Sequence, residues 1–353
     1  MKSFASDNYA GAHSAVLSAL TQANAGHVPS YGDDPYTEAA VSVLQNQFGA
    51  DTHTRFLFNG TSANILCLSA LMKPWDGVIA ASTAHINTDE CGAPERVAGI
   101  KVIAVDTPDG KLTPALIAPV VEQLQDFEHA RQPKVVSISN VSELGTIYTP
   151  EETHALAEYV HSRNMYLHVD GARLANAAAA QEVSLAALSS AAGVDALSLG
   201  GTKNGMLFGD GALWFGQAAE EVRAGSFMLC KASSMLGSKL RFLSAQFVAM
   251  FEGDLWLECA AQANAMARRL AEGLPGSCEL AYPPAANEVF AHLPKGIIVP
   301  LQERFHFYTW KTGAGDTDCV RWVTSWDTTT EEVDSLLVAL AEAEAQRAVE
   351  AIQ

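Results

Sequence analysis

One lysine stands in a segment where a charged side chain is costly. Lys203 lies within SLGGTKNGMLFGDGALWF (198–215), whose flanking apolar runs predict two strands joined by a tight turn. Burial disfavours the charged form of an amine, so we expect a lowered pKa for Lys203. A neutral amine is a nucleophile toward aldehydes. The segment therefore indicates covalent chemistry with an aldehyde group.

The segment FNGTSAN (58–64) suits phosphate binding. Gly60 lets the backbone approach a ligand closely, while Thr61 and the first N–H groups of the helix expected to follow can hold a phosphate. The same residue types also make an ordinary helix cap, so this alternative stays open. The segment is not a Walker loop, because no Gly-Lys-Ser/Thr follows it.

The segment LHVDGAR (167–173) ends an expected strand with Asp170 and Arg173. In open parallel sheets, ligands bind beyond the carboxyl ends of the strands, which makes both residues candidate ligand contacts. An ion pair that braces a turn is the alternative. Together, a phosphate-binding helix, a strand-end aspartate and a strand-end lysine are the groups that pyridoxal 5'-phosphate (PLP) requires.

The elements that must position these residues alternate between strand and helix. We expect strands at 55–58, 77–82, 100–106, 134–140, 165–173 and 194–201, and helices at 14–24, 37–48, 59–72, 114–127, 150–164 and 185–193. The Ala-rich run 174–188 is also typical of close-packed helix. This alternation predicts an α/β fold with a mostly parallel, doubly wound sheet.

The pattern changes near residue 250. Long helices, three expected antiparallel strands (287–294, 304–310 and 319–326) and a closing helix from Thr330 follow. We therefore predict an N-terminal arm and a large domain over 1–250, and a small α+β domain over 251–353.

Composition narrows the class of protein. Of the 353 residues, 48% are hydrophobic, and 40 Asp+Glu against 22 Lys+Arg give a net charge of -18. This charge argues against nucleic acid or an anionic membrane as partner, and no run is long enough to span a membrane. The six cysteines are scattered without CxxC spacing, so we expect no metal site and reduced thiols in a cytoplasmic protein.

Longer motifs follow one another in the order of a known family. They are SDNYAG (6–11), YGDDPYT (31–37), NGTSAN, AHINTDECGAPE (84–95), DGKLTP (109–114), HVDGAR, GGTKNG (200–205), SKLRFLSA (238–245) and VRWVTSWDT (320–328). Over nearly its whole length the chain resembles the low-specificity L-threonine aldolases, PLP-dependent enzymes of fold type I in the aspartate-aminotransferase-like superfamily.

The resemblance implies a fold and an activity. The fold would have a mostly parallel mixed sheet flanked by helices and a smaller C-terminal domain. The enzyme would be a lyase that cleaves L-threonine, L-allo-threonine and related β-hydroxy-α-amino acids, such as phenylserine, to glycine and an aldehyde. It would form a homotetramer, a dimer of dimers whose subunits share active sites.

The resemblance also implies which residues hold PLP. Lys203 would form a Schiff base with it, and Asp170 would pair with its pyridine nitrogen. His85 would stack on the ring, and Gly60 and Thr61 would hold the phosphate.

Further roles concern the substrate. The resemblance implies that Arg173 and Arg321 hold the substrate carboxylate near Ser6, with Arg173 also touching the ring oxygen of PLP. It places Glu90 near the side-chain hydroxyl of the substrate. Tyr31, with Asp34, would line the pocket of a neighbouring subunit.

Two places depart from the family pattern. Many members carry a histidine in the loop after the strand at 134–140, where this chain has VSEL, near Ser142. The catalytic base therefore stays open between His85 and water held by Glu90. The residue that reaches a neighbour's phosphate is taken as Arg241, with Lys239 and Lys231 as alternatives.

Three other classes of protein share some of these sequence features. A β-eliminating lyase, a racemase or an aminotransferase of the same fold would share Lys203, Asp170 and the phosphate segment. A non-catalytic protein of this fold is disfavoured because both arginines, Arg173 and Arg321, are retained beside them. A Rossmann dehydrogenase is disfavoured because no G-x-G-x-x-G follows the first strand.

Overall fold

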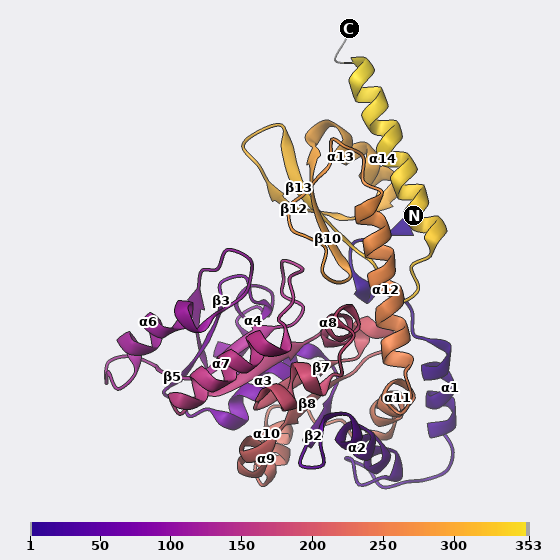
Figure 1. Ribbon diagram of the computed structural model, residues 1–353. Helices are drawn as coiled ribbons and strands as arrows, with labels where there is room; N and C mark the ends of the chain where they lie inside the picture. Colours follow the sequence, from indigo (N-terminus) through magenta and orange to yellow (C-terminus); the bar gives the residue numbers. More distant parts are fainter. Residues whose placement is uncertain (1, 351–353) are drawn as a thin grey trace.

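The chain folds into a large α/β part and a smaller part that stands beside it. The structure is a computed structural model, and it describes residues 2–350. Figure 1 shows the larger part below and the smaller part above, with the long helices α12 (Leu255–Glu272) and α14 (Thr330–Glu350) rising along one side. Among the described residues, no helix combines the length and the apolar character that crossing a membrane requires.

A seven-stranded sheet forms the centre of the larger part. Its strand order is β2-β8-β7-β6-β5-β3-β4, and β8 alone runs against the others. The strands are β2 (His53–Leu57), β3 (Asp76–Ala81), β4 (Lys101–Val105), β5 (Gln132–Ser139), β6 (Tyr166–Gly171), β7 (Ala196–Gly200) and β8 (Asp210–Trp214). This confirms the predicted mostly parallel, mixed sheet.

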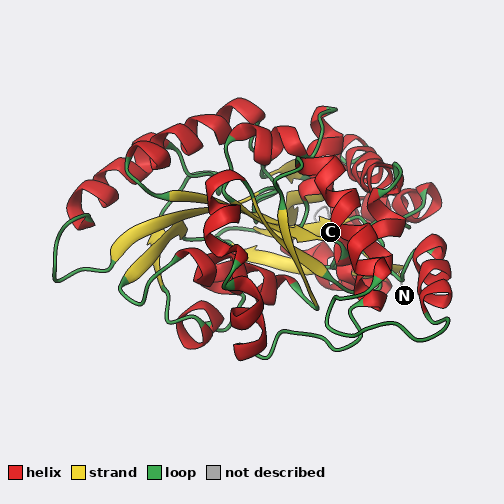
Figure 2. Ribbon diagram, turned by 90° about the horizontal axis from the view of Figure 1, so that it is seen from below, coloured by secondary structure: helices red, strands yellow, loops and turns green. Residues whose placement is uncertain are grey.

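Helices cover both faces of this sheet (Figure 2). Because both faces are covered, strands such as β3, β7 and β8 are buried along their whole length and consist of nearly continuous apolar residues. The helices of this part are α1 (Ser14–Ala23), α2 (Pro35–Phe48), α3 (Gly60–Leu71), α4 (His85–Thr88), α5 (Ala93–Val97), α6 (Pro114–Leu124), α7 (Pro150–Ser162), α8 (Leu174–Gln181), α9 (Gly216–Arg223), α10 (Ser226–Ala232) and α11 (Arg241–Phe251).

The smaller part has an antiparallel sheet of order β12-β13-β10-β9. Its strands are β9 (Glu279–Leu280), β10 (Glu288–Pro294), β12 (Tyr308–Thr312) and β13 (Thr317–Val323), and α13 (Lys295–Arg304) packs against β10 and α14. Its core includes Phe4, because the N-terminal strand β1 (Lys2–Ser3) pairs with β11 (Phe305–His306). The arm therefore lies against the smaller part before the chain enters the large sheet. The predicted boundary near residue 250 stays a prediction.

One predicted helix differs from the structure. The segment 185–193 forms two short 3-10 turns, η2 (Ala186–Leu188) and η3 (Ser190–Ala192), and α8 accounts for only the first part of the Ala-rich run. Between the turns, Ser189 leaves the helical conformation (φ -142°, ψ -103°). Its hydroxyl donates to the carbonyl of Leu185, and Ser190 donates to the carbonyl of Phe48. Serine hydroxyls thus compete with helical hydrogen bonding.

The register of the central strands sets the position of the functional groups. Asp170 of β6 lies opposite Ser139 of β5 on one side and Ser198 of β7 on the other. Ser139 and Asp170 lie toward the carboxyl ends of their parallel strands, and Ser198 lies in the middle of β7. Lys203 follows β7 in the 3-10 turn η4 (Thr202–Asn204), so the same edge of the sheet receives the carboxylate and the amine.

Candidate active site

A cavity of about 270 Å³ opens at this edge of the sheet. It is lined by Gly60, Thr61, His85, Glu90, Asp170, Arg173 and Lys203, together with neighbouring residues. Seven of the residues predicted from the sequence are therefore brought together in one place, although they come from segments spread over more than 140 residues.

One end of the cavity is the N-terminus of α3. Asn59 caps this helix, because its Oδ1 accepts a hydrogen bond from the N–H of Ser62 at 2.9 Å. The first N–H groups of a helix have no partner within the helix and carry partial positive charge, so Gly60 and Thr61 can hold an anionic group here. A Cβ on Gly60 would lie 3.8 Å from Oδ1 of Asp210. Burial raises the pKa of the Asp210 carboxyl to about 7, and Asp170 adds to this rise while Lys203 opposes it.

Asp170 is held in place by two donors. Its Oδ1 accepts the N–H of Ala172 at 3.0 Å, and its Oδ2 accepts Nδ2 of Asn64 at 2.8 Å. Asn64 is in turn fixed by Ser198, whose hydroxyl donates to Oδ1 of Asn64 at 2.5 Å. The Asp170 carboxylate is thus fixed in orientation, and within residues 2–350 it forms no ion pair, which leaves its charge available to a ligand.

A buried histidine completes this network. Nε2 and Nδ1 of His168 lie 2.9 Å from the hydroxyls of Ser198 and Ser137, respectively. Since Ser198 donates to Asn64, Nε2 of His168 must carry the proton and donate to Ser198. Burial lowers the pKa of His168 to about 4, although Asp170 opposes this. His168 is therefore a neutral support behind Asp170.

Lys203 opens onto the same cavity. Burial lowers the pKa of its amine and the nearby guanidinium of Arg173 lowers it further, whereas Asp7, Asp170 and Glu288 oppose the shift. The direction is the one expected from the sequence. It raises the fraction of neutral amine, the form that attacks an aldehyde.

His85 lies at the start of α4, and Glu90 lies behind it. Nδ1 of His85 is 3.0 Å from Oε1 of Glu90, which also accepts Nδ2 of Asn64 at 2.9 Å. The hydrogen bond with Glu90 raises the pKa of His85. The Glu90 side chain has no exposed surface, so its effect on a substrate would pass through His85.

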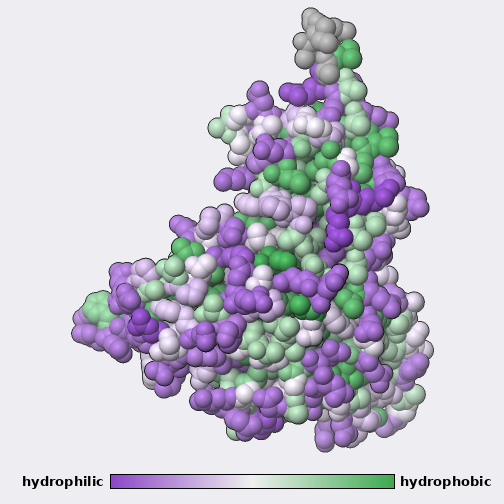
Figure 3. Space-filling model, viewed as in Figure 1, coloured by the Kyte–Doolittle hydropathy of each residue, from purple (hydrophilic) through white to green (hydrophobic). Residues whose placement is uncertain are grey.

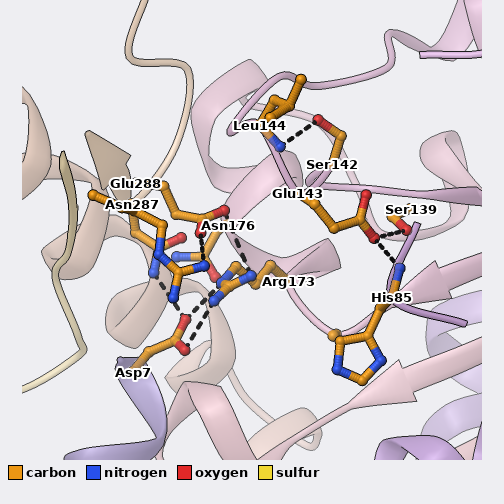
Figure 4. Close-up of polar contacts among 12 residues, drawn as sticks. Asp7, His85, Ser139, Ser142, Glu143, Leu144, Arg173, Asn176, Asn287 and Glu288 are labelled. Carbon is orange, nitrogen blue, oxygen red and sulfur yellow. Dashed lines mark hydrogen bonds and ion pairs between the residues drawn. The ribbon is translucent and has the colours of Figure 1, made fainter. Parts of the chain in front are cut away.

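Two arginines and two acidic residues form an ionic cluster beside the cavity, which Arg173 lines; Figure 4 labels its members Arg173, Asp7 and Glu288. Arg173 donates from Nε and Nη2 to the Asp7 carboxylate at 2.6 and 3.1 Å. Glu288 lies between the arginines, 3.5 Å from Nη1 of Arg173 and 3.6 Å from Nη1 of Arg321. Burial alone would raise the pKa of Asp7, but the charges of Arg173 and Lys203 and the hydrogen bonds from Arg173 and Asn287 together lower it. The cluster can receive a carboxylate in competition with these acidic side chains.

Arg321 itself lies farther from the cavity than Arg173 and does not line it. Its guanidinium stacks over the ring of Trp310, 4.7 Å from the ring centre, and its Nη2 donates to the carbonyl of Ala5 at 3.4 Å. It reaches Arg173 through the shared Glu288 rather than by lining the cavity directly.

Several predicted residues lie outside the cavity of this chain. Ser6 caps the 3-10 turn η1 (Asp7–Tyr9), where its hydroxyl accepts the N–H of Asn8. Tyr31 is 41% exposed and lies beneath the Lys231 amine, 5.2 Å from its ring centre. Arg241 donates to the carbonyl of Gly26 at 3.2 Å. Tyr31 and Arg241 stay predictions for a site that a neighbouring subunit would complete.

Sequence reasoning missed Glu143. This residue lines the cavity in the loop after β5, and its Oε1 accepts the N–H of His85 at 2.8 Å and the hydroxyl of Ser139 at 2.6 Å. The only sequence signal for it is an acidic residue directly after Ser142 in VSEL. Asn64 and Asp210 were missed as well, although Asn64 lies within the quoted NGTSAN motif.

The groups His85, Glu90 and Asp170 approach one another closely enough for a metal site, with one ligand atom of each within 4.8 Å of the others. However, Glu90 Oε1 and Asp170 Oδ2 both accept the same amide nitrogen of Asn64. The Asn64 amide therefore already occupies one oxygen of each of these two carboxylates.

The donor set instead fits PLP. An anion site at a helix N-terminus, a fixed and unpaired carboxylate and a lysine with a lowered pKa surround one cavity. Each of these groups matches one part of PLP: the phosphate, the pyridine nitrogen and the aldehyde carbon.

Comparisons with known proteins agree with this geometry. Residues 3–294 match the model of the beta-eliminating lyase family. The chain is 42% identical over 339 residues to the low specificity L-threonine aldolase of Pseudomonas aeruginosa, covering 94% of this chain and 95% of the relative.

Solved structures give the same result. The threonine aldolase of Leishmania major superimposes with a TM-score of 0.92 at 31% identity, covering 97% of this chain and 99% of the other. The Oryza sativa TDC solved with PLP and tryptamine has a TM-score of 0.74 at 16% identity over 96% of this chain and 82% of the other, which shows a shared fold.

Proposed function

The chain belongs to the beta-eliminating lyase family, among the low-specificity L-threonine aldolases, and from this premise we propose that it uses PLP to cleave β-hydroxy-α-amino acids. The substrates are L-threonine, L-allo-threonine and related compounds such as phenylserine, and the products are glycine and an aldehyde. The observation that carries the proposal is the meeting of Lys203, Asp170 and the N-terminus of α3 at one cavity beside Arg173.

Different residues of the cavity would bind different parts of the cofactor. Lys203 would hold the aldehyde carbon of PLP, and Asp170 would pair with its pyridine nitrogen. Gly60 and Thr61 hold the phosphate, and His85 covers the ring. Bound in this way, PLP withdraws electrons from the α-carbon of the substrate.

The arginines orient the substrate. A guanidinium presents a planar pair of donors that matches a carboxylate. Arg173 and Arg321 fix the carboxylate and thereby turn the Cα–Cβ bond to the direction in which it is weakened. Asp7 and Glu288 hold the two arginines in place before the substrate enters. Much of the rate acceleration then comes from orientation.

We also propose that four chains form a dimer of dimers with shared active sites. Large apolar side chains that are at least one-third exposed support this assembly, among them Tyr31, Phe58, Leu207, Phe227 and Met228. Figure 3 shows apolar patches between the polar residues of the face turned to the viewer. We propose a cytoplasmic location, which the six free cysteines favour because disulfides belong to oxidising compartments.

The activity is tested by following glycine release from L-threonine by the PLP-loaded protein without any keto acid. Release of glycine and acetaldehyde in equal amounts is the expected result. An absolute requirement for a keto acid would indicate an aminotransferase, and formation of pyruvate from serine without glycine would indicate a β-eliminating lyase.

A further inference from the structure

Cleavage of a β-hydroxy-α-amino acid needs a group that accepts the proton of the Cβ hydroxyl. The titratable side chains that line the cavity and are candidates for this step are Asp170, Asp210, Glu90, Glu143, His85 and Lys203. The contacts of each side chain show which of them is free to accept this proton.

Three of these side chains have other tasks in the proposed function. Asp170 and Lys203 face the cofactor. Asp210 lies behind Gly60, at the phosphate end of the cavity. None of the three is placed to serve the side chain of the substrate.

His85 and Glu90 are also poorly placed to accept the proton of the Cβ hydroxyl. The Glu90 side chain has no exposed surface, and its Oε1 is engaged by Asn64 and His85. The same contact occupies Nδ1 of His85, and the proposed function already gives its imidazole the separate task of covering the cofactor ring.

Glu143 has a different environment. In Figure 4 it lies beside Ser139 and the backbone of His85, on the side of the cavity away from Arg173 and Glu288. Oε1 is anchored by the two hydrogen bonds from Ser139 and His85, and neither bond involves Oε2. No lysine or arginine forms an ion pair with Glu143 among residues 2–350. A substrate held by its carboxylate at Arg173 and by its amine near Lys203 can direct its side chain toward this wall.

We propose that Glu143 is the base that takes the proton from the Cβ hydroxyl of the substrate, an inference that rests on the proposed aldolase function. The proton moves from the hydroxyl oxygen to Oε2 of Glu143, and the O–H electron pair forms the second bond of the aldehyde carbonyl. The Cα–Cβ bond breaks, and its electron pair stays with the carbon that becomes Cα of glycine. That carbon then takes up a proton from solvent and Glu143 releases its proton to solvent, so glycine and a neutral aldehyde leave.

The surroundings of Glu143 make it a stronger base than an exposed carboxylate. Burial raises its pKa, while the hydrogen bonds from Ser139 and the His85 N–H limit the rise, and Asp170 adds to it. The other ionisable groups that face it are Arg173, Lys203, His85 and Glu90 across the cavity and Tyr148 behind the loop. A carboxylate with a raised pKa is a stronger base than an exposed one.

The first test is Glu143→Gln, whose amide oxygen can still accept both anchoring hydrogen bonds. We expect the rate of L-threonine cleavage to fall by about 100- to 10,000-fold, the usual contribution of a general base. Exchange of the α-protons of glycine with deuterated solvent involves no hydroxyl, so its rate and the dissociation constant of glycine should stay within about threefold of wild type.

Two results would overturn the proposal: cleavage that falls by less than about tenfold, or glycine exchange that falls in proportion to cleavage. The matched control is Asp195→Asn, an acid-to-amide change at the opposite edge of the sheet, where Asp195 contacts His161 at 2.8 Å. This control should cleave L-threonine at the wild-type rate. Wild-type protein without aldolase activity would refute the proposed function instead, so the two failures are distinguishable.

A second variant keeps the proposal testable if Glu143→Gln does not fold. Ser139→Ala removes one hydrogen bond to the charged form of Glu143 and so raises its pKa further. Because the base must be deprotonated, the acidic limb of the kcat/KM profile should move to higher pH by about half to one unit. An acidic limb at the wild-type pH in a folded, PLP-loaded Ser139→Ala protein would contradict the role of Glu143.

Discussion

Replacing Arg321 by lysine distinguishes two roles of this residue: contact with the substrate carboxylate, and a structural ion pair with Glu288. The substitution keeps the positive charge beside Glu288, 3.6 Å from Nη1 in the native protein, but removes the planar fork. If Arg321 holds the substrate carboxylate together with Arg173, the variant loses at least one charge-assisted hydrogen bond. Such a bond contributes about 1.5–3 kcal/mol, which corresponds to an increase of about 10- to 100-fold in KM for L-threonine.

Initial rates of acetaldehyde formation over a range of L-threonine concentrations give this KM. The cofactor absorbance band should be unchanged, since PLP does not depend on Arg321 in this account. The variant also loses the stacking of the guanidinium on Trp310, so a small decrease in thermal stability is expected in either case. Arg269→Lys, at an exposed pair with Asp334, is the matched control and should leave KM unchanged.

A KM within about threefold of wild type at normal turnover in Arg321→Lys would refute a substrate contact of Arg321. Arg321 would then serve only to neutralise the buried Glu288, and Arg173 would be the sole anchor of the substrate carboxylate.

Three further predictions concern the support of the cofactor, acid stability and assembly. Asp170→Asn should bind PLP but lose activity by about 100-fold or more in the cleavage assay, because a neutral pyridine withdraws electrons poorly; activity within a few-fold of wild type would contradict the role of Asp170. His168 has a pKa lowered to about 4 from 6.5, so it destabilises the folded state as pH falls between these values, by up to about 3 kcal/mol. Thermal melting between pH 7 and 4.5 should therefore show a steeper loss for wild type than for His168→Asn, and parallel curves would refute this. Phe227→Asp, at an exposed apolar position outside the cavity, should dissociate the oligomer in light scattering and lower activity, whereas an active tetramer would argue against a contact there.

The sequence predicted those parts of the fold and site that depend on local pattern. The alternation of strands and helices placed Asp170 and Lys203 at strand ends, and parallel strands bring such ends to one edge of the sheet. The helix start at Gly60 was equally recognisable, because Asn59, Thr61 and Ser62 are typical capping residues.

The rest depends on contacts between distant segments, which spacing does not reveal. Asp7 meets Arg173 across 166 positions, and Asn64 meets Asp170 across 106. Glu143 was not recognised as a site residue because only the fold brings its loop against the backbone of His85, 58 positions away. The segment 185–193 was misjudged because its alanines favour helix locally, whereas its serines bond to carbonyls instead.

The central claim is that Lys203 binds PLP covalently. Reduction of the PLP-loaded protein with borohydride, followed by proteolysis and mass spectrometry, identifies the modified residue. We expect the absorbance band of the bound cofactor to disappear and the pyridoxyl group to be found on the peptide containing Lys203. A pyridoxyl group on another lysine, or no modification after loading with PLP, would contradict it.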